Sequence, residues 1–294
     1  MRRPDLDGAA ADEAARLVAA HLRRARRRAK AWRRAPDDRE ALHALRTALR
    51  RLRALLRAFR PVLGDIGRGA IRRRLRLAAG TTSALRDLDV FADWVAVQPA
   101  VPQGRRLLRR IRKATSDELA AVGPAFDAAW TGADRRMRRA LQAHASAATA
   151  PAHAGGGARG GRRFEGALRT AVQRECLALR AGLPALDPVR RPDEVHGLRI
   201  AAKRLRHLLD AAAPRTMVVR RSIAWCRAWQ DRVGAWRDAH VATAMLRRWR
   251  DEPAVLALRR AHRRRLRESR VALETFAADR HAWRDALDVR WSRA

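Results

Sequence analysis

The sequence predicts an all-α fold of two tandem four-helix bundles related by internal duplication. Apolar residues recur at steps of three and four along most of the chain, which is the period of amphipathic helices. No alternating apolar and polar pattern of useful length indicates a β-strand. A basic helical pattern near the start of the chain returns in its second half, so we expect whole helical units to be repeated.

The first half, residues 10–145, is expected to contain the first set of helices. Pro36 ends the opening helix, and Asp37 or Asp38 is placed to cap the next one. Gly80 to Thr82 are expected to loosen the middle of the third helix, and Gly123-Pro124 to interrupt the chain after the fourth. The expected helices span about 12–34, 39–60, 70–97, 103–122 and 133–145.

A stretch rich in Gly and Ala, residues 146–161, is predicted to be a flexible linker. Gly156 and Gly161 have the spacing of a phosphate-binding loop, but Arg162-Arg163 replaces the required Lys-Ser/Thr pair and no strand precedes it. The second half, residues 162–294, repeats the helical order, and the chain 1–294 is expected to act as one domain. Its helices are expected at about 163–182, 194–212, 216–250 and 253–277, with a short last helix carrying Trp283, Leu287 and Trp291.

The repeated feature is an apolar row with a basic row beside it. In the first copy the apolar row is Leu42, Leu45, Leu49, Leu52 and Leu56, and the basic row is His43, Arg46, Arg50, Arg53 and Arg57. A shift of one residue turns about 100° around a helix, so the basic row lies on the flank of the buried face. No acidic residue lies between Ala41 and Arg60. Like charges at i,i+4 destabilise a helix by about 0.2–0.5 kcal/mol per pair, and an anionic partner along the row would reverse that cost.

The second copy has the same arrangement. Its apolar row is Val195, Leu198, Ala202, Leu205 and Leu209, and its basic row is His196, Arg199, Lys203 and Arg206. Each basic residue of this row lies 153 positions after its counterpart in the first copy. A second shared element, Arg86-Asp87 and Arg237-Asp238, recurs with an offset of 151. Two linked matches favour duplication over chance.

The charge balance indicates a polyanionic partner. The 294 residues include 66 basic and 30 acidic side chains, which gives a net charge of +36, and 47% of the residues are hydrophobic. Such an excess attracts nucleic acid, inorganic polyphosphate or an anionic membrane surface. Lys occurs only at positions 30, 113 and 203. Arg suits phosphate geometry, although a GC-rich coding sequence explains the same preference.

Cysteine usage and the N-terminal sequence indicate an intracellular setting. Cys176 and Cys226 are too few for a disulfide framework and are expected to be reduced, buried side chains. Acidic residues stand where a signal peptide needs an apolar run, and no run of 18 apolar residues offers a membrane span. We therefore expect a cytoplasmic protein without a membrane partner.

At the two basic rows and the two Arg-Asp elements the chain resembles the CHAD family, the conserved histidine α-helical domain. The resemblance rests on His43-x-x-Arg46 with Arg50, Arg51 and Arg53, and on His196-x-x-Arg199 with Lys203, Arg204 and Arg206. It implies binding of inorganic polyphosphate in a basic cavity lined by the two His-x-x-Arg helices, and with it an association with polyphosphate granules in the cytoplasm. Many relatives carry a fused CYTH triphosphatase domain marked by Glu-x-Glu-x-Lys, but no Glu-x-Glu occurs here, so that activity is not expected.

Further cations are candidates for the same site. They lie on the fourth helices: Arg109, Arg112 and Lys113 in the first half, and Arg260, Arg263, Arg264 and Arg267 in the second. Some of these cations are expected to close the cavity and others to face water. His43 and His196 are candidate phosphate donors, with helix packing as the alternative, and Asp87 and Asp238 are expected to form structural salt bridges or caps.

No enzymatic activity, metal or cofactor is expected. His-x-x-Arg supplies no further metal ligands, and no paired carboxylates, His-Glu-x-x-His or Gly-x-Ser-x-Gly pattern is present. Non-specific nucleic-acid binding is the alternative function, since a strongly basic chain attracts any polyanion. A phosphatase or kinase acting on polyphosphate is disfavoured, because the carboxylates that would hold Mg²⁺ are missing.

Overall fold

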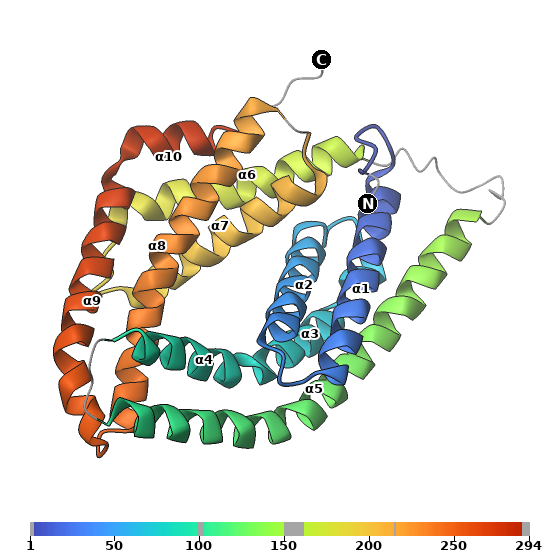
Figure 1. The fold of residues 1–294 in the computed structure, drawn as a ribbon. Helices are drawn as coiled ribbons and strands as arrows, with labels where there is room; N and C mark the ends of the chain where they lie inside the picture. Colours follow the sequence, from blue (N-terminus) through green and yellow to red (C-terminus); the bar gives the residue numbers. More distant parts are fainter. Residues whose placement is uncertain (1–2, 99–102, 150–161, 215, 290–294) are drawn as a thin grey trace. The chain divides into compact units, whose positions relative to one another are not determined.

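The computed structural model describes residues 3–98, 103–149, 162–214 and 216–289, and these residues form an all-α protein (Figure 1). No β-strand occurs in these ranges, where the only pairing of extended backbone is an isolated bridge between Ala9 and Arg163. The all-α prediction is thus confirmed. The helices are α1 (Ala10–Arg34), α2 (Arg39–Ala58), α3 (Gly69–Thr81), α4 (Ser83–Ala96), α5 (Gly104–Thr149), α6 (Phe164–Gly182), α7 (Pro192–Ala212), α8 (Met217–Arg248), α9 (Pro253–Ala278) and α10 (Arg280–Leu287), with short 3-10 helices η1 (Gly64–Gly67) and η2 (Leu183–Ala185).

The predicted interruption at Gly123-Pro124 is wrong, because α5 continues through it without a break. A proline inside a helix removes the hydrogen bond to the carbonyl four residues earlier. Here both Pro124 and Ala120 are exposed, so water can satisfy the freed carbonyl. Phe126, Trp130 and further buried positions continue the apolar face beyond the proline, and their burial keeps the chain helical.

Two other boundaries differ from the expectation. The predicted helix 70–97 is divided at Thr82 into two helices, α3 and α4. Thr82 is fully buried and belongs to the Gly80–Thr82 segment, which was expected to loosen the middle of that helix. Residues 146–149, predicted as part of the linker, belong to α5, and the rest of that segment, 150–161, lies outside the described residues. Trp291 of the predicted last helix also lies outside them.

The chain forms two compact units, each made of separate segments. Unit 1 comprises Met1–Thr81, Gly123–Arg174 and His207–Arg215, and unit 2 comprises Thr82–Val122, Glu175–Arg206 and Thr216–Ala294. Each unit therefore takes residues from both sides of the predicted linker. The internal duplication and the division into halves stay sequence predictions.

Unit 1 is built on the packing of α1 along α2 (Figure 1). The Asp38 side chain caps α2 by accepting hydrogen bonds from the backbone amides of Glu40, at 2.8 Å, and Ala41, at 3.1 Å. All five leucines of the first apolar row are buried, as predicted. Between α1 and the second part of α5, Trp32 meets Phe126 edge to face with ring centroids 5.2 Å apart. The basic row of α2 is thereby fixed beside a closed core.

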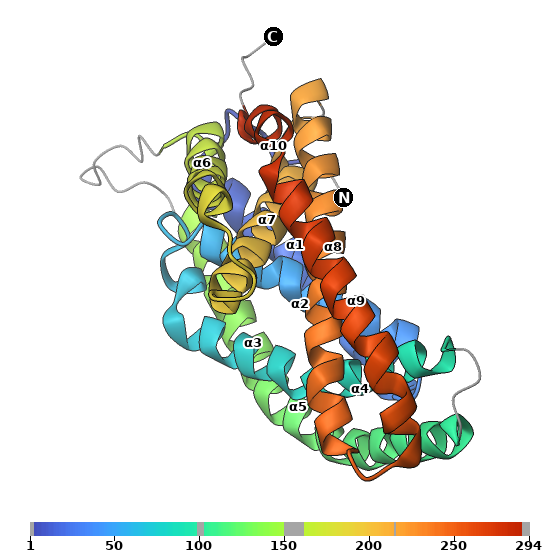
Figure 2. The ribbon, with the colours of Figure 1, turned by 90° about the vertical axis from the view of Figure 1, so that its left-hand side faces the viewer.

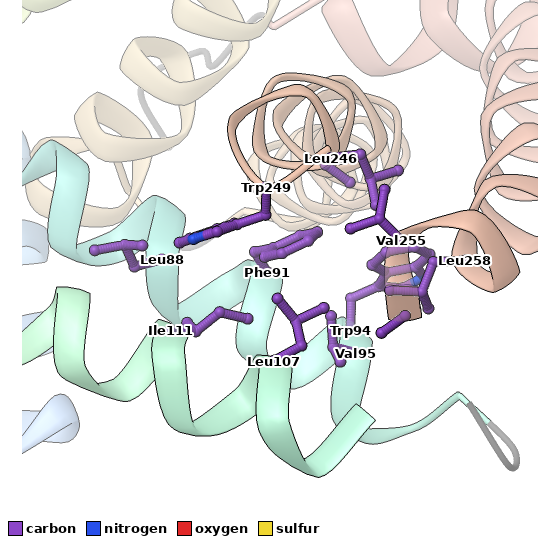
Figure 3. Packing of buried hydrophobic residues seen from close by; sticks show 12 residues of the cluster. Leu88, Phe91, Trp94, Val95, Leu107, Ile111, Leu246, Trp249, Val255 and Leu258 are labelled. Carbon is purple, nitrogen blue, oxygen red and sulfur yellow. The ribbon is translucent and has the colours of Figure 1, made fainter. Parts of the chain in front are cut away.

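Unit 2 has its own aromatic core, in which α8 and α9 run side by side (Figure 2). Figure 3 shows side chains of α4, the start of α5, the end of α8 and the start of α9 meeting in one cluster. At its centre Phe91 stacks on Trp249, with ring centroids 5.5 Å apart and planes 10° apart. Trp225, Trp229 and Trp236 are buried along α8, in agreement with a packing role.

Both cysteines are buried and free, as expected, and burial raises the pKa of the Cys176 thiol to about 12. Among the described residues, no helix combines the length and apolar content that a membrane span requires.

The imidazole of His21 is enclosed in unit 1, where it is 5% exposed. Burial, followed by the charges of Arg51 and Arg24, lowers its pKa from 6.5 to about 4. The folded state therefore holds His21 neutral while the unfolded state binds a proton below pH 6.5. Its contribution to stability is complete above that pH and is lost as the pH falls toward 4.

Replacing His21 with Leu should weaken the acid sensitivity of the fold. Between pH 7 and pH 4.5 the wild type should lose about 2–3 kcal/mol of unfolding free energy through this residue, and the variant should not. Urea unfolding followed by circular dichroism at several pH values measures the difference. His281→Leu, at an exposed position of α10, is the control and should keep the wild-type pH dependence. Equal pH dependence of His21→Leu and wild type would contradict the assignment.

Candidate functional site

The basic row of α2 lies on the flank of the buried leucine row, as predicted from the sequence. His43 and Arg57 are exposed at its two ends, and Arg46, Arg50 and Arg53 between them are half-buried. Arg50 is held against its own helix, since its Nε donates to the Arg46 carbonyl at 3.2 Å and its Nη2 to Thr47 Oγ1 at 3.1 Å. Arg51, the remaining candidate on this helix, is also half-buried. The row thus presents cations at the edge of the core of unit 1.

Three cations that sequence reasoning missed extend this row. Burial and the charge of Arg76 lower the pKa of Arg53. Burial and then Arg60, Arg57 and Arg76 lower that of Arg72. We call Arg53, Arg57, Arg60, Arg72 and Arg76 the α2–α3 arginine cluster. Within the described residues none of the five has an acidic partner, so their repulsion is not compensated. The Arg-rich run at the start of α3 was the available signal in the sequence.

The basic row of α7, as far as Arg206, belongs to unit 2. His196 is exposed, and Arg199, Lys203, Arg204 and Arg206 are half-buried. Burial, followed by the charges of Arg237, Arg199 and Lys203, lowers the pKa of His196. Burial first, and then the surrounding cations, therefore favour the neutral form of this imidazole. Arg204 has a structural partner, with its Nη1 3.7 Å from the buried Glu175 carboxylate.

Three arginines from three helices interact with one carboxylate in unit 2, and Arg237 adds its charge next to Arg199. Nη2 of Arg86 donates to Asp238 Oδ1 at 2.8 Å, and its Nη1 donates to Asp87 Oδ1 at 3.3 Å. Burial lowers the pKa of Arg86, but Asp238 and Asp87 outweigh it, so the pKa is raised. We call Arg86 of α4, Arg199 of α7, Arg237 and Asp238 of α8, and Arg265 of α9 the Asp238 cluster.

The other members of the Asp238 cluster are less well compensated. Burial, then Arg237 and Arg86, lower the pKa of Arg199 against the opposing charge of Asp238. Burial lowers the pKa of Arg265, and Asp238 again opposes the shift. The guanidinium of Arg265 lies over the Trp94 ring, 5.6 Å from its centroid.

Two buried donors of this cluster have no acceptor. Nε of Arg199 and Nη1 of Arg265 find no hydrogen-bond partner within the described ranges. An unsatisfied buried donor costs about 1–3 kcal/mol, and more when it is charged. An anionic oxygen brought by a ligand would satisfy such donors.

The predicted fourth-helix cations lie on open faces instead. Arg109, Arg112 and Lys113 of α5 and Arg260, Arg263, Arg264 and Arg267 of α9 are all exposed. Arg264 is 3.7 Å from Glu268 on its own helix. Arg265, which is absent from that set, is the α9 arginine that joins the Asp238 cluster. The expected structural salt bridge of the Arg-Asp elements is present as the Arg86–Asp238 pair. Within the described ranges, no three His, Cys, Asp or Glu side chains gather as a metal-binding group.

The chain matches the model of a known family. The model of the CHAD domain matches residues 16–247, and the chain belongs to that family. A comparison with curated protein sequences gave no match.

Two solved structures have a similar fold. The crystal structure of the CHAD domain from the plant Ricinus communis aligns with a TM-score of 0.68 and 19% identity, covering 98% of this chain and 95% of that one. PptA from Streptomyces chartreusis aligns with a TM-score of 0.56 and 18% identity, covering 92% of this chain and 100% of that one. At these identities the likeness concerns the fold.

Substituting Arg199 with Met should stabilise the protein in the absence of ligand. The change removes a like charge and a donor without an acceptor, so we expect a gain of about 1 kcal/mol at low salt. Thermal unfolding by circular dichroism at low and high salt measures it, and the gain should shrink at high salt. Arg221→Met, at an exposed position of α8, is the control and should change stability little. A loss of stability in Arg199→Met alone would show that this cation is already compensated.

Proposed function

We propose that this chain binds inorganic polyphosphate without chemically changing it. One observation carries the proposal: arginines at the edge of the core hold donors that lack acceptors, beside other arginines that repel them. Such an arrangement is unfavourable in the free protein and becomes favourable when an anion is bound. Membership of the CHAD family supports the same ligand.

A chain of phosphates fits these clusters better than a single phosphate does. Successive residues of each basic row are three or four positions apart, which corresponds to a rise of about 4.5–6 Å along the helix. A flexible polyanion can follow such a row with charge-assisted bonds from consecutive arginines. Two basic rows on one chain also allow a long ligand to gain from a second, intramolecular contact.

The proposed absence of catalysis rests on the carboxylates near the cations. Asp87 and Asp238 are both engaged by Arg86, at 3.3 and 2.8 Å. Phosphoryl transfer depends on positioned Mg²⁺ ions, which need free oxygen ligands next to the phosphates. Carboxylates already bound to an arginine are poor candidates for that role.

Non-specific nucleic-acid binding is the second candidate, and the outer face of α1 favours it. Arg23, Arg27, Lys30 and Arg34 follow one another at steps of four, three and four along about 16 Å of helix, and all are exposed. Arg26 and Arg33 pair with Asp134 and Asp127 of α5, but these four have no acidic partner among the described residues. An open row of this kind attracts any phosphate backbone.

The combined substitution of Arg199 and Arg265 with Gln should lower polyphosphate affinity by about tenfold or more, since charged hydrogen bonds contribute about 1.5–3 kcal/mol each. Fluorescence titration with long-chain polyphosphate, with single-stranded DNA of equal charge as competitor, provides the measurement. The control, Arg260→Gln with Arg263→Gln, removes the same charge from the open face of α9 and should cost much less. An equal loss in both variants, or displacement by the DNA, would favour non-specific polyanion binding.

Incubation with long-chain polyphosphate or triphosphate and Mg²⁺ or Mn²⁺ should release no orthophosphate above the buffer blank. The reason is the engagement of Asp87 and Asp238 by Arg86. A colorimetric phosphate assay over several protein concentrations checks this. Release that grows in proportion to purified protein would refute the non-enzymatic proposal.

A further inference from the structure

The Asp238 carboxylate lies among the arginines that would bind an anionic ligand. Its side chain is 22% exposed, and its Oδ1 already accepts the bond from Arg86 Nη2 at 2.8 Å. Its charge also acts on Arg199 and on Arg265, which come from two other helices. One carboxylate of the protein thus interacts with cations of α4, α7 and α9 at once.

The Asp238 carboxylate reduces the net positive charge of the cluster. Arg86, Arg199 and Arg265 interact with Asp238, Arg237 adds a positive charge that acts on Arg199, and Asp87 adds a second carboxylate that contacts Arg86. Asp238 compensates its neighbours only partly, since the pKa values of Arg199 and Arg265 stay lowered. The cluster therefore keeps an attraction for anions, but a weaker one than the same arginines would have without Asp238.

We propose that Asp238 is a specificity-determining residue, an internal anion that excludes short phosphates from the Asp238 cluster and leaves it open to long ones. This inference rests on the proposed polyphosphate binding and assigns the length selection of that same site to one side chain.

The selection follows from how the two classes of ligand compete. Asp238 is attached to the protein, so its effective concentration near the arginines is high, and a small dianion gains little by competing with it. A long chain need not displace it, because its other phosphates can reach further cations of the α7 row, among them Lys203 and Arg206. The Asp238 carboxylate therefore lowers the affinity of a short ligand by a larger factor than that of a long ligand.

The test is Asp238→Asn, which keeps the shape of the side chain and removes its charge. Pyrophosphate affinity should rise about tenfold, as expected for removing one repulsive charge at close range in a partly buried site. Affinity for long-chain polyphosphate should rise less, so the ratio of the two affinities falls. Calorimetric titration measures both. Asp231→Asn is the matched control, an identical change two turns earlier on the exposed face of α8, and should alter neither affinity by more than about twofold.

Loss of the Arg86–Asp238 pair also weakens the fold, so stability is measured in the same experiment. Pyrophosphate should raise the melting temperature of Asp238→Asn more than that of wild type or Asp231→Asn, because the added anion replaces the missing carboxylate. Asp238→Glu keeps the charge and should keep the discrimination against pyrophosphate.

Two results would overturn the inference. One is an Asp238→Asn protein whose pyrophosphate affinity is unchanged or reduced, and the other is a variant that pyrophosphate fails to stabilise. Both differ from failure of the proposed function, in which wild-type protein itself binds no long-chain polyphosphate. A gain of pyrophosphate affinity in Asp238→Asn would support the internal-anion role even then.

Discussion

The structure depends on apolar burial that holds mutually repelling arginines in place. Along α2, buried leucines lie beside half-buried arginines, and no acidic residue occurs between Ala41 and Arg60. Burying one leucine contributes about 1.5–3 kcal/mol, whereas a like-charge pair at i,i+4 costs about 0.2–0.5 kcal/mol. Leucine burial therefore decides the balance, and the folded chain can keep cations in positions that favour an anion. Stability of these helices would be favoured by fewer like charges, whereas the proposed anion binding needs those charges.

The two units manage this repulsion differently. The α2–α3 arginine cluster of unit 1 has no acidic partner within the described residues, while Asp238 in unit 2 links α4 to α8 and partly compensates two further arginines. The two Arg-Asp elements, which look like counterparts in sequence, meet directly here through Arg86 and Asp238. Family membership accounts for the helical scaffold, and the compensation by Asp238 is a local difference in charge between the two clusters.

Helical periodicity and capping chemistry were enough to predict most of the fold, including α2 and the ends of α8 and α9. The sequence offered Asp37 or Asp38 as the cap of α2, and the structure selects Asp38. The continuity of α5 through Pro124 was not predictable, because it depends on burial beyond the proline and on water access at Ala120. For the site, the rows on α2 and α7 followed from their apolar neighbours. On α9 the sequence pointed to Arg260, Arg263, Arg264 and Arg267, whereas the inward residue is Arg265. One position turns about 100°, and only the packing against Trp94 selects it. The Arg86–Asp238 contact spans 152 residues, a pairing that no local pattern specifies.

The central claim is that donors left without acceptors at the edge of the core are the binding groups. A crystal structure with a short polyphosphate bound tests it most directly. The account predicts phosphate oxygens within hydrogen-bond distance of Arg199 Nε or Arg265 Nη1, with Asp238 still at the cluster or displaced toward Arg86. Phosphates found only on the outer face of α1 or on the open face of α9, with both donors still unpartnered, would contradict it.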